Sequence, residues 1–426
     1  MRVLVIGGGG REHAIIDALS KSSKVTALFC SPGNGGTARQ ARNVNIEMAD
    51  PAFIAEWAEV NAIDLVVVGP EDALVVGVAD MCLASGIACL GPKAAGAYLE
   101  GSKSYAKDLM AKYGIPTAEY EVFDTSAEAM AYLDTAKMPV VVKADGLAAG
   151  KGVVVAVTLA DARGAVTKCF EGLYGTAGDC IVIEEFLEGQ ECSLLAFTDG
   201  KTVLPMVPAQ DHKRALDNDE GPNTGGMGVY TPVPAVDKAT LAEMTRILEQ
   251  TVAALVSEGI DYRGILYGGF VLTEEGPKVL EFNARFGDPE TQVVLPLLKT
   301  DLVDVLMATI EQRLDEITLE WSDDAVVSVV LASGGYPGTY EKGKTIKGID
   351  QAEEIEGVRV YHAGTVLAKD LTVFTNGGRV LNVTAIAPTL AEARSRAYEA
   401  VDLISFEDMQ YRTDIGLKAL RALGEA

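Results

Sequence analysis

Residues 143–152 read Lys143-Ala-Asp-Gly-Leu-Ala-Ala-Gly-Lys-Gly152, a glycine-rich segment between two apolar runs, residues 139–143 and 153–157, that are typical of strands. A P-loop has four residues between its glycines, but here three residues separate Gly146 from Gly150, and a glycine follows Lys151. The segment also leads into a strand, whereas a P-loop opens a helix. We therefore predict a hairpin loop that closes as a lid over a polyphosphate, with Lys143 adding a fixed positive charge. An ordinary mobile β-hairpin is the alternative.

The residues before this segment predict an α/β domain. Apolar runs that suit strands, at residues 2–6, 25–30, 64–68 and 86–90, alternate with helical patterns. One helix is predicted over residues 52–60, because Asp50 can cap it and Pro51 suits its first position. Continuous apolar strands separated by helices are typical of a parallel sheet covered on both faces. We therefore predict an N-terminal, Rossmann-like parallel-sheet domain over residues 1–101.

Two further domains follow. Ser102 can cap a helix that begins the central domain, predicted over residues 102–322 with a mobile lid subdomain at about residues 122–190. After Trp321 the pattern changes to short strands, and residues 323–426 are predicted as an α+β C-terminal domain. Its strands are predicted at residues 325–331, 358–366, 371–374 and 380–385, its helix at 391–403, and a hairpin turn at 375–378.

Composition excludes several classes of partner. The 426 residues contain 36 Lys and Arg against 61 Asp and Glu, so the formal net charge is -25. Such a surface repels nucleic acid and anionic lipid, and neither is expected as a partner. The six cysteines form no CxxC pair and are expected to be thiols in a reducing compartment. No apolar stretch reaches the roughly 18 residues of a membrane span, so we expect a cytoplasmic protein with no membrane partner.

A metal site is predicted at the end of one strand. Glu281 and Asn283 are two residues apart, and because strand side chains alternate, both face the same side. Together with phosphate oxygens, such hard oxygen ligands suit Mg²⁺. Arg285 continues the same face toward the phosphate charge. A solvated strand edge is the alternative for this pair when it is taken alone.

Other segments are consistent with a nucleotide and substrate site. Residues 184–187 end a strand and can present backbone groups to an adenine edge, with Glu191 available for ribose hydroxyls. Positive charge gathers in residues 211–214, before the glycine-rich loop 221–228. A solvated strand end and a solvated charge run beside a flexible loop are the respective alternatives.

The glycines at residues 7–10 do not fit a dinucleotide fingerprint. Glu12 stands where the third glycine of G-x-G-x-x-G belongs, and the second predicted strand ends without a carboxylate for a ribose hydroxyl. Nicotinamide binding is therefore disfavoured. The turn can still offer amide donors to a phosphate at a helix N-terminus, or it can be a purely structural tight turn.

Taken in order, these motifs resemble the ATP-grasp superfamily and, within it, the glycinamide ribonucleotide synthetase family. The blocks that carry the resemblance span essentially the whole chain, at residues 8–13, 31–34, 68–71, 101–103, 143–152, 183–187, 210–214, 221–228, 281–290 and 375–379. The resemblance implies an ATP-dependent ligase of purine synthesis. It would join glycine to 5-phosphoribosylamine through a glycyl phosphate, giving glycinamide ribonucleotide, ADP and phosphate.

The resemblance also implies site residues. Those for ATP are Lys103, Lys143, Gly146, Gly150, Lys151, Gly152, Glu184, Glu185, Leu187 and Glu191. Mg²⁺ or Mn²⁺ would be held by Glu281 and Asn283, while Arg285 and Lys151 would be the catalytic residues. Those for the two substrates are Gly8, Gly9, Gly10, Glu71, His212, Lys213, Thr224, Gly225, Gly226, Met227 and Asp288. Many superfamily members supply another metal carboxylate from the preceding strand, where this chain has Gly268 and Gly269, so the number of metal ions stays open.

Three alternatives stay open at this point. The first is an ATP-grasp carboxylate-amine ligase with another acid or amine. The second is a nicotinamide oxidoreductase built on the N-terminal turn, and the third is a regulator that binds ATP without releasing phosphate. Separate titrations with ATP and NAD(H) distinguish the second from the others. We expect a monomer or a weak homodimer.

Overall fold

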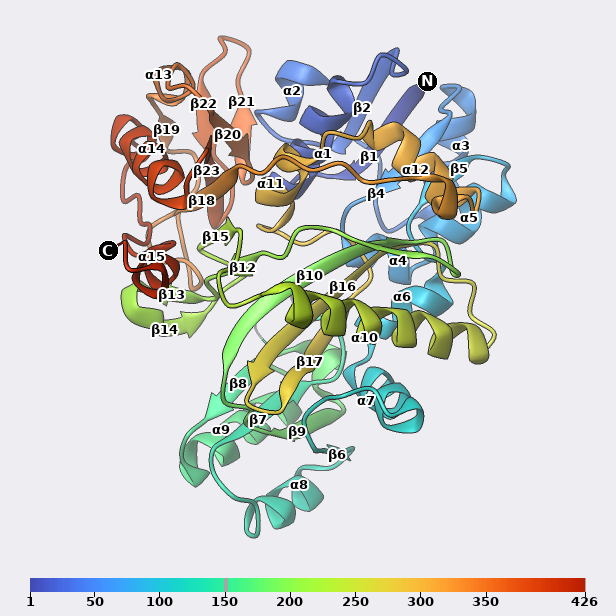
Figure 1. Ribbon diagram of the computed structural model, residues 1–426, viewed down its shortest axis with the longest axis vertical. Coiled ribbons are helices and arrows are strands. Elements are labelled where there is room, and N and C mark those ends of the chain that lie inside the picture. The colour runs from blue at the N-terminus through green and yellow to red at the C-terminus, as the bar shows by residue number, and fades with distance from the viewer. Residues whose placement is uncertain (149–151, 426) are drawn as a thin grey trace.

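The structure is a computed structural model that describes residues 1–148 and 152–425. Figure 1 shows the N-terminal and C-terminal domains beside each other at one end, the lid sheet at the other end, and the central sheet between them. Within the described ranges, no helix has the length and apolar character that crossing a bilayer requires.

The N-terminal domain is built on a parallel sheet, as predicted, which has one strand (β3) beyond the four predicted. Its strand order is β3-β2-β1-β4-β5. The strands are Arg2–Gly7 (β1), Ala27–Pro32 (β2), Arg42–Asn43 (β3), Leu65–Val68 (β4) and Ala88–Leu90 (β5). The helices are Gly10–Ser20 (α1), Thr37–Gln40 (α2), Pro51–Val60 (α3), Glu71–Val75 (α4), Val78–Ala84 (α5) and Ala94–Gly101 (α6).

Strand β1 is apolar throughout because both of its faces are covered. Leu4 and Ile6 pack in one hydrophobic core, while Val3 and Val5 pack in another, and all four side chains are fully buried. Alternation along the strand sends successive side chains to opposite faces. Asp50 caps α3 by accepting a hydrogen bond from the backbone N–H of Phe53 at 3.0 Å, as the sequence predicts.

The central domain contains a four-stranded antiparallel sheet in the order β11-β10-β16-β17. Its strands are Gln190–Thr198 (β10), Val203–Pro205 (β11), Gly264–Thr273 (β16) and Gly276–Asn283 (β17). The helices Lys238–Ser257 (α10) and Leu302–Ile310 (α12) cover its faces, and Lys103–Tyr113 (α7) packs on β17. In β10, Leu194 lies in the same core as Leu248 of α10, and Leu195 in the same core as Leu306 of α12. The sheet is therefore buried on both sides.

The lid has a sheet and a hydrophobic core of its own. The sheet order is β6-β9-β7-β8, and two helices pack on it. Its elements are Tyr120–Phe123 (β6), Ser126–Leu133 (α8), Val140–Ala144 (β7), Val153–Ala156 (β8), Leu159–Phe170 (α9), Gly175–Gly178 (η1) and Ile181–Glu185 (β9). Strands β7 and β8 pair antiparallel on either side of the glycine-rich segment, as predicted.

The C-terminal domain combines two sheets with helices. The larger sheet has the order β12-β15-β18-β23-β20, and the smaller has the order β19-β22-β21. Its own elements are Ala325–Ala332 (β18), Thr345–Ile346 (β19), Ile349–Ala352 (α13), Val358–His362 (β20), Thr365–Leu367 (β21), Val373–Thr375 (β22), Arg379–Ala387 (β23), Leu390–Leu403 (α14) and Leu417–Leu423 (α15). Two strands from the middle of the chain, Gln210–Asp211 (β12) and Gly228–Thr231 (β15), join the larger sheet.

Short elements complete the described chain. They are Arg214–Leu216 (β13), Asp217–Asp219 (η2), Glu220–Asn223 (β14), Thr291–Val294 (α11), Leu295–Leu297 (η3) and Leu314–Glu316 (η4). Strands β13 and β14 form a two-stranded sheet that lies between the central and C-terminal domains.

Two sequence predictions in the C-terminal domain are wrong. Residues 358–366 are not one strand, because β20 and β21 belong to different sheets. Residues 375–378 are not a hairpin turn, since β22 and β23 also lie in different sheets. The cause is a close crossing of two glycines: a Cβ on Gly364 would lie 2.5 Å from the Cα of Gly377. The chain changes sheet at this crossing, where Gly364 N–H donates to Arg379 O at 2.9 Å.

Candidate active site

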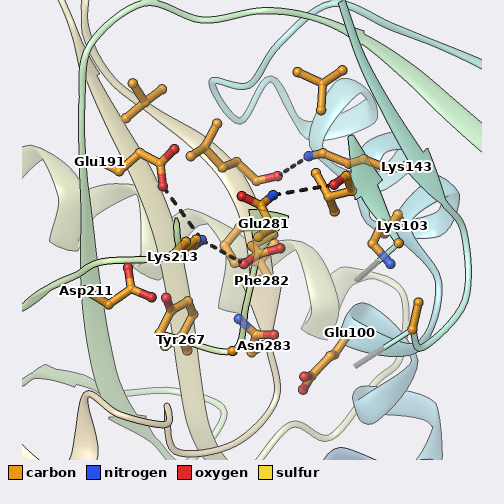
Figure 2. A pocket seen from close by; sticks show the side chains of 18 of the residues that line it. Glu100, Lys103, Lys143, Glu191, Asp211, Lys213, Tyr267, Glu281, Phe282 and Asn283 are labelled. Atoms are coloured by element: carbon orange, nitrogen blue, oxygen red, sulfur yellow. Dashed lines mark hydrogen bonds and ion pairs between the residues drawn. The ribbon is translucent and has the colours of Figure 1, made fainter. Parts of the chain in front are cut away.

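A cavity of about 670 Å³ lies where the lid, the central sheet and the two terminal domains meet. Figure 2 shows charged side chains of several elements pointing into it. Most of the site residues predicted from the sequence line this cavity. They are Glu71, Lys103, Lys143, Gly152, Glu184, Glu185, Leu187, Glu191, His212, Lys213, Thr224, Gly225, Glu281, Asn283, Arg285 and Asp288.

Other predicted site residues do not line the cavity. Among the described residues these are Gly8, Gly9, Gly10, Gly146, Gly226 and Met227. Gly9 is close to the site, because a Cβ on it would lie 3.1 Å from Oδ2 of Asp288. Met227 is fully buried, so its side chain is part of the core. Gly150 and Lys151 lie outside the described residues.

Two lysines give one wall of the cavity its positive charge. Lys143, on β7, donates a hydrogen bond to Leu280 O at 2.9 Å and forms an ion pair with Glu184 at 2.8 Å. Lys103, at the start of α7, donates to Gly146 O at 2.9 Å. Burial lowers the pKa of Lys103, and the Lys143 ammonium lowers it further, although the Glu281 carboxylate opposes both. The wall therefore holds close positive charges that an anion would stabilise.

The predicted metal ligands face the cavity from the end of β17. Glu281 and Asn283 both line it, next to Lys103 and Lys213 (Figure 2). Lys213 is the main cause that lowers the pKa of Glu281 to about 2, and although burial opposes it, the carboxylate is ionised at neutral pH. In the neighbouring strand, Gly269 pairs with Glu281, and a Cβ there would lie 3.2 Å from Glu281 Cγ. The glycine therefore leaves room for the carboxylate.

The donor set fits Mg²⁺ or Mn²⁺ bound largely through phosphate. Glu281 and Asn283 supply two hard oxygens from one strand, and Mg²⁺ usually takes one or two carboxylates plus phosphate oxygens and water. Within residues 1–148 and 152–425, no group of three His, Cys, Asp or Glu side chains could hold an ion alone. An ion held by Glu281 and Asn283 would need further oxygen ligands, such as those of a phosphate.

Arg285 is held by acidic residues of the N-terminal domain. Its guanidinium lies 3.1 Å from Glu71 Oε2 and 2.7 Å from Glu100 Oε1, and it also donates to Asn283 Oδ1 at 3.3 Å. Burial raises the pKa of Glu71, but Arg285 and Arg11 outweigh it and bring that pKa to about 2. Burial raises the pKa of Glu100 to about 7, against the effect of Arg285. Arg285 is thus fixed beside Asn283, one of the two predicted metal ligands.

The opposite wall is formed by β12, one of the strands that join the C-terminal sheet, and by the residues that follow it up to Arg214. Burial, with a contribution from Arg412, lowers the pKa of His212 to about 4, so His212 adds no charge at neutral pH. The predicted basic turn at residues 211–214 is therefore basic through Lys213 and Arg214 only. Burial lowers the pKa of Lys213, but the Glu281 and Glu191 carboxylates outweigh it and hold that pKa well above its ordinary value.

Arg379 brings the C-terminal domain into the site. Its Nη1 donates to Gly225 O at 2.7 Å and to Asp288 O at 2.9 Å, and it lies 3.3 Å from Asp288 Oδ1. One side chain of β23 therefore joins two segments that the sequence predicts as substrate-binding.

Sequence reasoning missed several cavity residues. They are Arg11, Glu100, Lys107, Asp211, Tyr267, Glu290 and Arg379. A signal was present for Lys107, which stands four residues after Lys103 and so on the same face of α7. Asp211 and Arg379 belong to sequence blocks that the resemblance already covers. Glu100 is a single carboxylate near a helix end, and no pattern marks it.

Comparisons with known proteins agree over the whole chain. Residues 1–100, 101–291 and 326–418 match the N domain, the ATP-grasp (A) domain and the C domain of phosphoribosylglycinamide synthetase. Phosphoribosylamine-glycine ligase of Escherichia coli strain K12 is 50% identical over 425 residues, which are 99% of each chain. Phosphoribosylamine-glycine ligase of Brucella melitensis is 48% identical over 421 residues, 99% of this chain and 98% of that one. The crystal structure of phosphoribosylamine-glycine ligase from Thermotoga maritima is 35% identical and superposes with a TM-score of 0.84, covering 97% of this chain and 100% of that one. Sequence, domain order and fold together assign the chain to the phosphoribosylglycinamide synthetase family.

Proposed function

We propose that the chain is an ATP-dependent ligase that joins glycine to 5-phosphoribosylamine, giving glycinamide ribonucleotide, ADP and phosphate in purine synthesis. The relatives named above, which match this chain from end to end, carry out the ligation that their name states. The observation that supports the proposal best is the composition of the cavity wall. Lysines, arginines and the side-chain oxygens of Glu281 and Asn283, contributed by three domains, all line the same cavity.

Phosphorylation of a carboxylate by ATP brings two anions together, and the cleft supplies the opposing charge. Lys103 and Lys143 would neutralise the triphosphate on the side of the lid. Mg²⁺ or Mn²⁺, held by Glu281 and Asn283, would add positive charge at the phosphate oxygens. The Glu184 carboxylate is already paired with lysines, so the side chain is not available to the adenine. The adenine would instead contact the backbone of residues 184–187.

Arg285 is suited to the transferring phosphoryl group. It lies beside Asn283 and is fixed by Glu71 and Glu100, so its guanidinium needs little reorganisation when charge develops. Lys151 lies outside the described residues, and its proposed role in the closed lid rests on the sequence. Lys151→Ala should lower kcat, and an effect confined to thermal stability would contradict that role.

The two substrates would meet between the central and terminal domains. Glycine would bind near Thr224 and Gly225, and phosphoribosylamine between the glycine turn at residues 8–10, Glu71 and Asp288. Arg379 holds Gly225 and Asp288 together, so both subsites would share one rigid wall. A closed cavity would protect the glycyl phosphate from water until the amine displaces phosphate.

We place the reaction in the cytoplasm and expect a monomer or weak homodimer. All six cysteines are free thiols and five are buried, which is consistent with a reducing compartment. Sedimentation of the purified protein at several concentrations measures the oligomeric state directly.

Phosphate release from ATP tests the proposal. The reaction is run with glycine and freshly prepared phosphoribosylamine, and each component is omitted in turn. We expect release that requires all three substrates, and a product whose mass is that of glycinamide ribonucleotide. Phosphate release that does not depend on glycine, or that another amino acid supports equally well, would show that glycine is not the acid substrate.

A further inference from the structure

A buried cluster of two lysines and one glutamate lies in the cavity wall that Lys103 and Lys143 make positive. Lys143 Nζ is 2.8 Å from Oε1 of Glu184, and Lys107 Nζ is 2.9 Å from Oε2. The side chains are only 6%, 2% and 2% exposed for Lys143, Lys107 and Glu184. One carboxylate therefore forms ion pairs with two ammonium groups, and all three are shielded from water.

The cluster ties three parts of the protein together. Lys107 belongs to α7 and donates to Thr117 Oγ1 at 2.8 Å, and Thr117 in turn donates to Val279 O of β17 at 2.7 Å. Lys143 and Glu184 belong to β7 and β9 of the lid sheet. Lys107 is thus fixed from the central domain while it holds a carboxylate of the lid.

The charges of the cluster do not balance. Two ammonium groups and one carboxylate leave the cluster itself with one positive charge, which the nearby Glu185 and Glu281 carboxylates offset from outside it. Buried positive charge of this kind is stabilised when an anion approaches it. Burial, followed by the repulsion of Lys143, lowers the pKa of Lys107 to about 8, although Glu184 opposes both. The cluster therefore carries buried positive charge, which suits the binding of an anionic ligand.

The hydrogen bonds leave Lys143 partly available. Its hydrogen bond goes to Leu280 O, and among the described residues Glu184 Oε1 accepts no hydrogen bond despite the ion pair. If Lys107 were absent, Glu184 would face Lys143 alone, and the two would form a closed neutral pair.

We propose that Lys107 is a positioning residue for ATP, which engages Glu184 and thereby leaves the charge of Lys143 free for the phosphates. The inference rests on the proposed function in that it takes ATP as the anion. Lys107 acts through Glu184 and need not touch the nucleotide.

Titration calorimetry with Mg²⁺ and a non-hydrolysable ATP analogue, without glycine or amine, tests the inference. We expect Lys107→Met to weaken binding about 10-fold, the effect of one nearby charge at an intermediate dielectric constant. Adding Glu184→Gln to Lys107→Met restores the net charge of the cluster, and we expect binding to return to within about threefold of the wild-type value. Lys107→Arg keeps the charge and should bind nearly as the wild type does.

Lys112→Met is the matched control, because Lys112 lies on the same helix, is 61% exposed and pairs with Glu258 at the surface. It should leave binding unchanged. Equal binding by wild type and Lys107→Met overturns the inference, and so does a double variant that binds more weakly than Lys107→Met. A loss of thermal stability with unchanged affinity of the folded protein also overturns it. Should the wild type bind ATP but release no glycine-dependent phosphate, the proposed function fails while the role of Lys107 in ATP binding stands.

Discussion

The backbone N–H of His362 donates a hydrogen bond to Nδ1 of His13 over 2.8 Å. His13 belongs to α1 of the N-terminal domain and His362 to β20 of the C-terminal domain, and both rings are buried. Asn34 strengthens the same contact by donating to His362 O at 2.7 Å. Because Nδ1 of His13 accepts a hydrogen bond, it must carry no proton, so the two terminal domains are joined through a neutral imidazole.

Acid should therefore weaken this interface. Burial, with smaller effects of Arg359 and Arg39, lowers the pKa of His13 to about 3, below its ordinary 6.5. The folded state then binds fewer protons than the unfolded state, so stability present above pH 6.5 is lost as the pH falls toward 3. From this group we expect a loss of about 2 kcal/mol between pH 7.5 and pH 5. Urea unfolding at both pH values should show a smaller difference for His13→Gln, and equal differences would contradict the prediction.

Glu281→Gln should abolish most turnover while the fold is kept. The change removes a negative oxygen that would hold the metal, and such an interaction contributes several kcal/mol to the transition state, or at least about 100-fold in rate. The Mg²⁺ concentration for half-maximal rate should also rise. Glu275→Gln is the control, since Glu275 lies just before the same strand and is 77% exposed. Wild-type rates for Glu281→Gln would refute the metal assignment.

Gly269→Ala should disturb the same ligand from the neighbouring strand. The new Cβ would lie 3.2 Å from Glu281 Cγ and 3.5 Å from Tyr267 Cε1, so the carboxylate must move. Displacing a support of a metal ligand typically costs about 10-fold or more in metal affinity. We expect the Mn²⁺ or Mg²⁺ activation curve to shift to higher concentration, and an unshifted curve would contradict this prediction.

Arg379→Lys should impair both substrate subsites without affecting ATP. Both hydrogen bonds come from Nη1 at the far end of the guanidinium, and the ammonium of the shorter lysine side chain cannot take the place of that nitrogen. Two lost hydrogen bonds of about 1 kcal/mol each predict a rise of roughly 10- to 30-fold in KM for glycine and for the amine. The KM for ATP should stay as it is. Arg421→Lys, at an exposed position of α15, is the control. A uniform rise in all three KM values would instead indicate that the substitution disturbs the structure of the whole site.

The affinity for ATP should fall in mildly alkaline solution. Lys107 has its pKa lowered to about 8, first by burial and then by Lys143, against the pull of Glu184 and Glu185, and it also lies over the ring of Tyr120. Its positive charge is present below that pKa and is lost as the pH rises through it. Binding of the ATP analogue between pH 7 and 9.5 should weaken in the wild type, whereas Lys107→Arg should show a flatter profile. Parallel profiles would mean that another group titrates.

Local patterns in the sequence were sufficient for much of the fold. The continuous apolar run of β1 predicts a strand buried on both faces, and the structure places its side chains alternately in two cores. The caps Asp50 and Ser102 bond to their helices as predicted, because a cap acts only within one turn. The spacing of two residues predicts that Glu281 and Asn283 share one side of a strand, and both do line the cavity, while their role as metal ligands stays a prediction.

Contacts between distant segments could not be predicted in this way. Strands β12 and β15 pair within the C-terminal sheet although they come from the middle of the chain. This pairing brings the segment between them, residues 212–224, close to Arg379. The predicted hairpin at residues 375–378 failed because the crossing of Gly364 and Gly377 depends on where the two sheets meet.

The sequence by itself therefore determined most of the secondary structure, the order of the domains and the residue types suited to phosphate and metal. Only the tertiary structure decided that Glu100 and Glu71 hold Arg285, that Lys107 shares Glu184 with Lys143, and that His212 is neutral. The physical reason is range. Propensity, capping and alternation act over a few residues, whereas burial and charge pairing depend on groups that only the folded chain brings together.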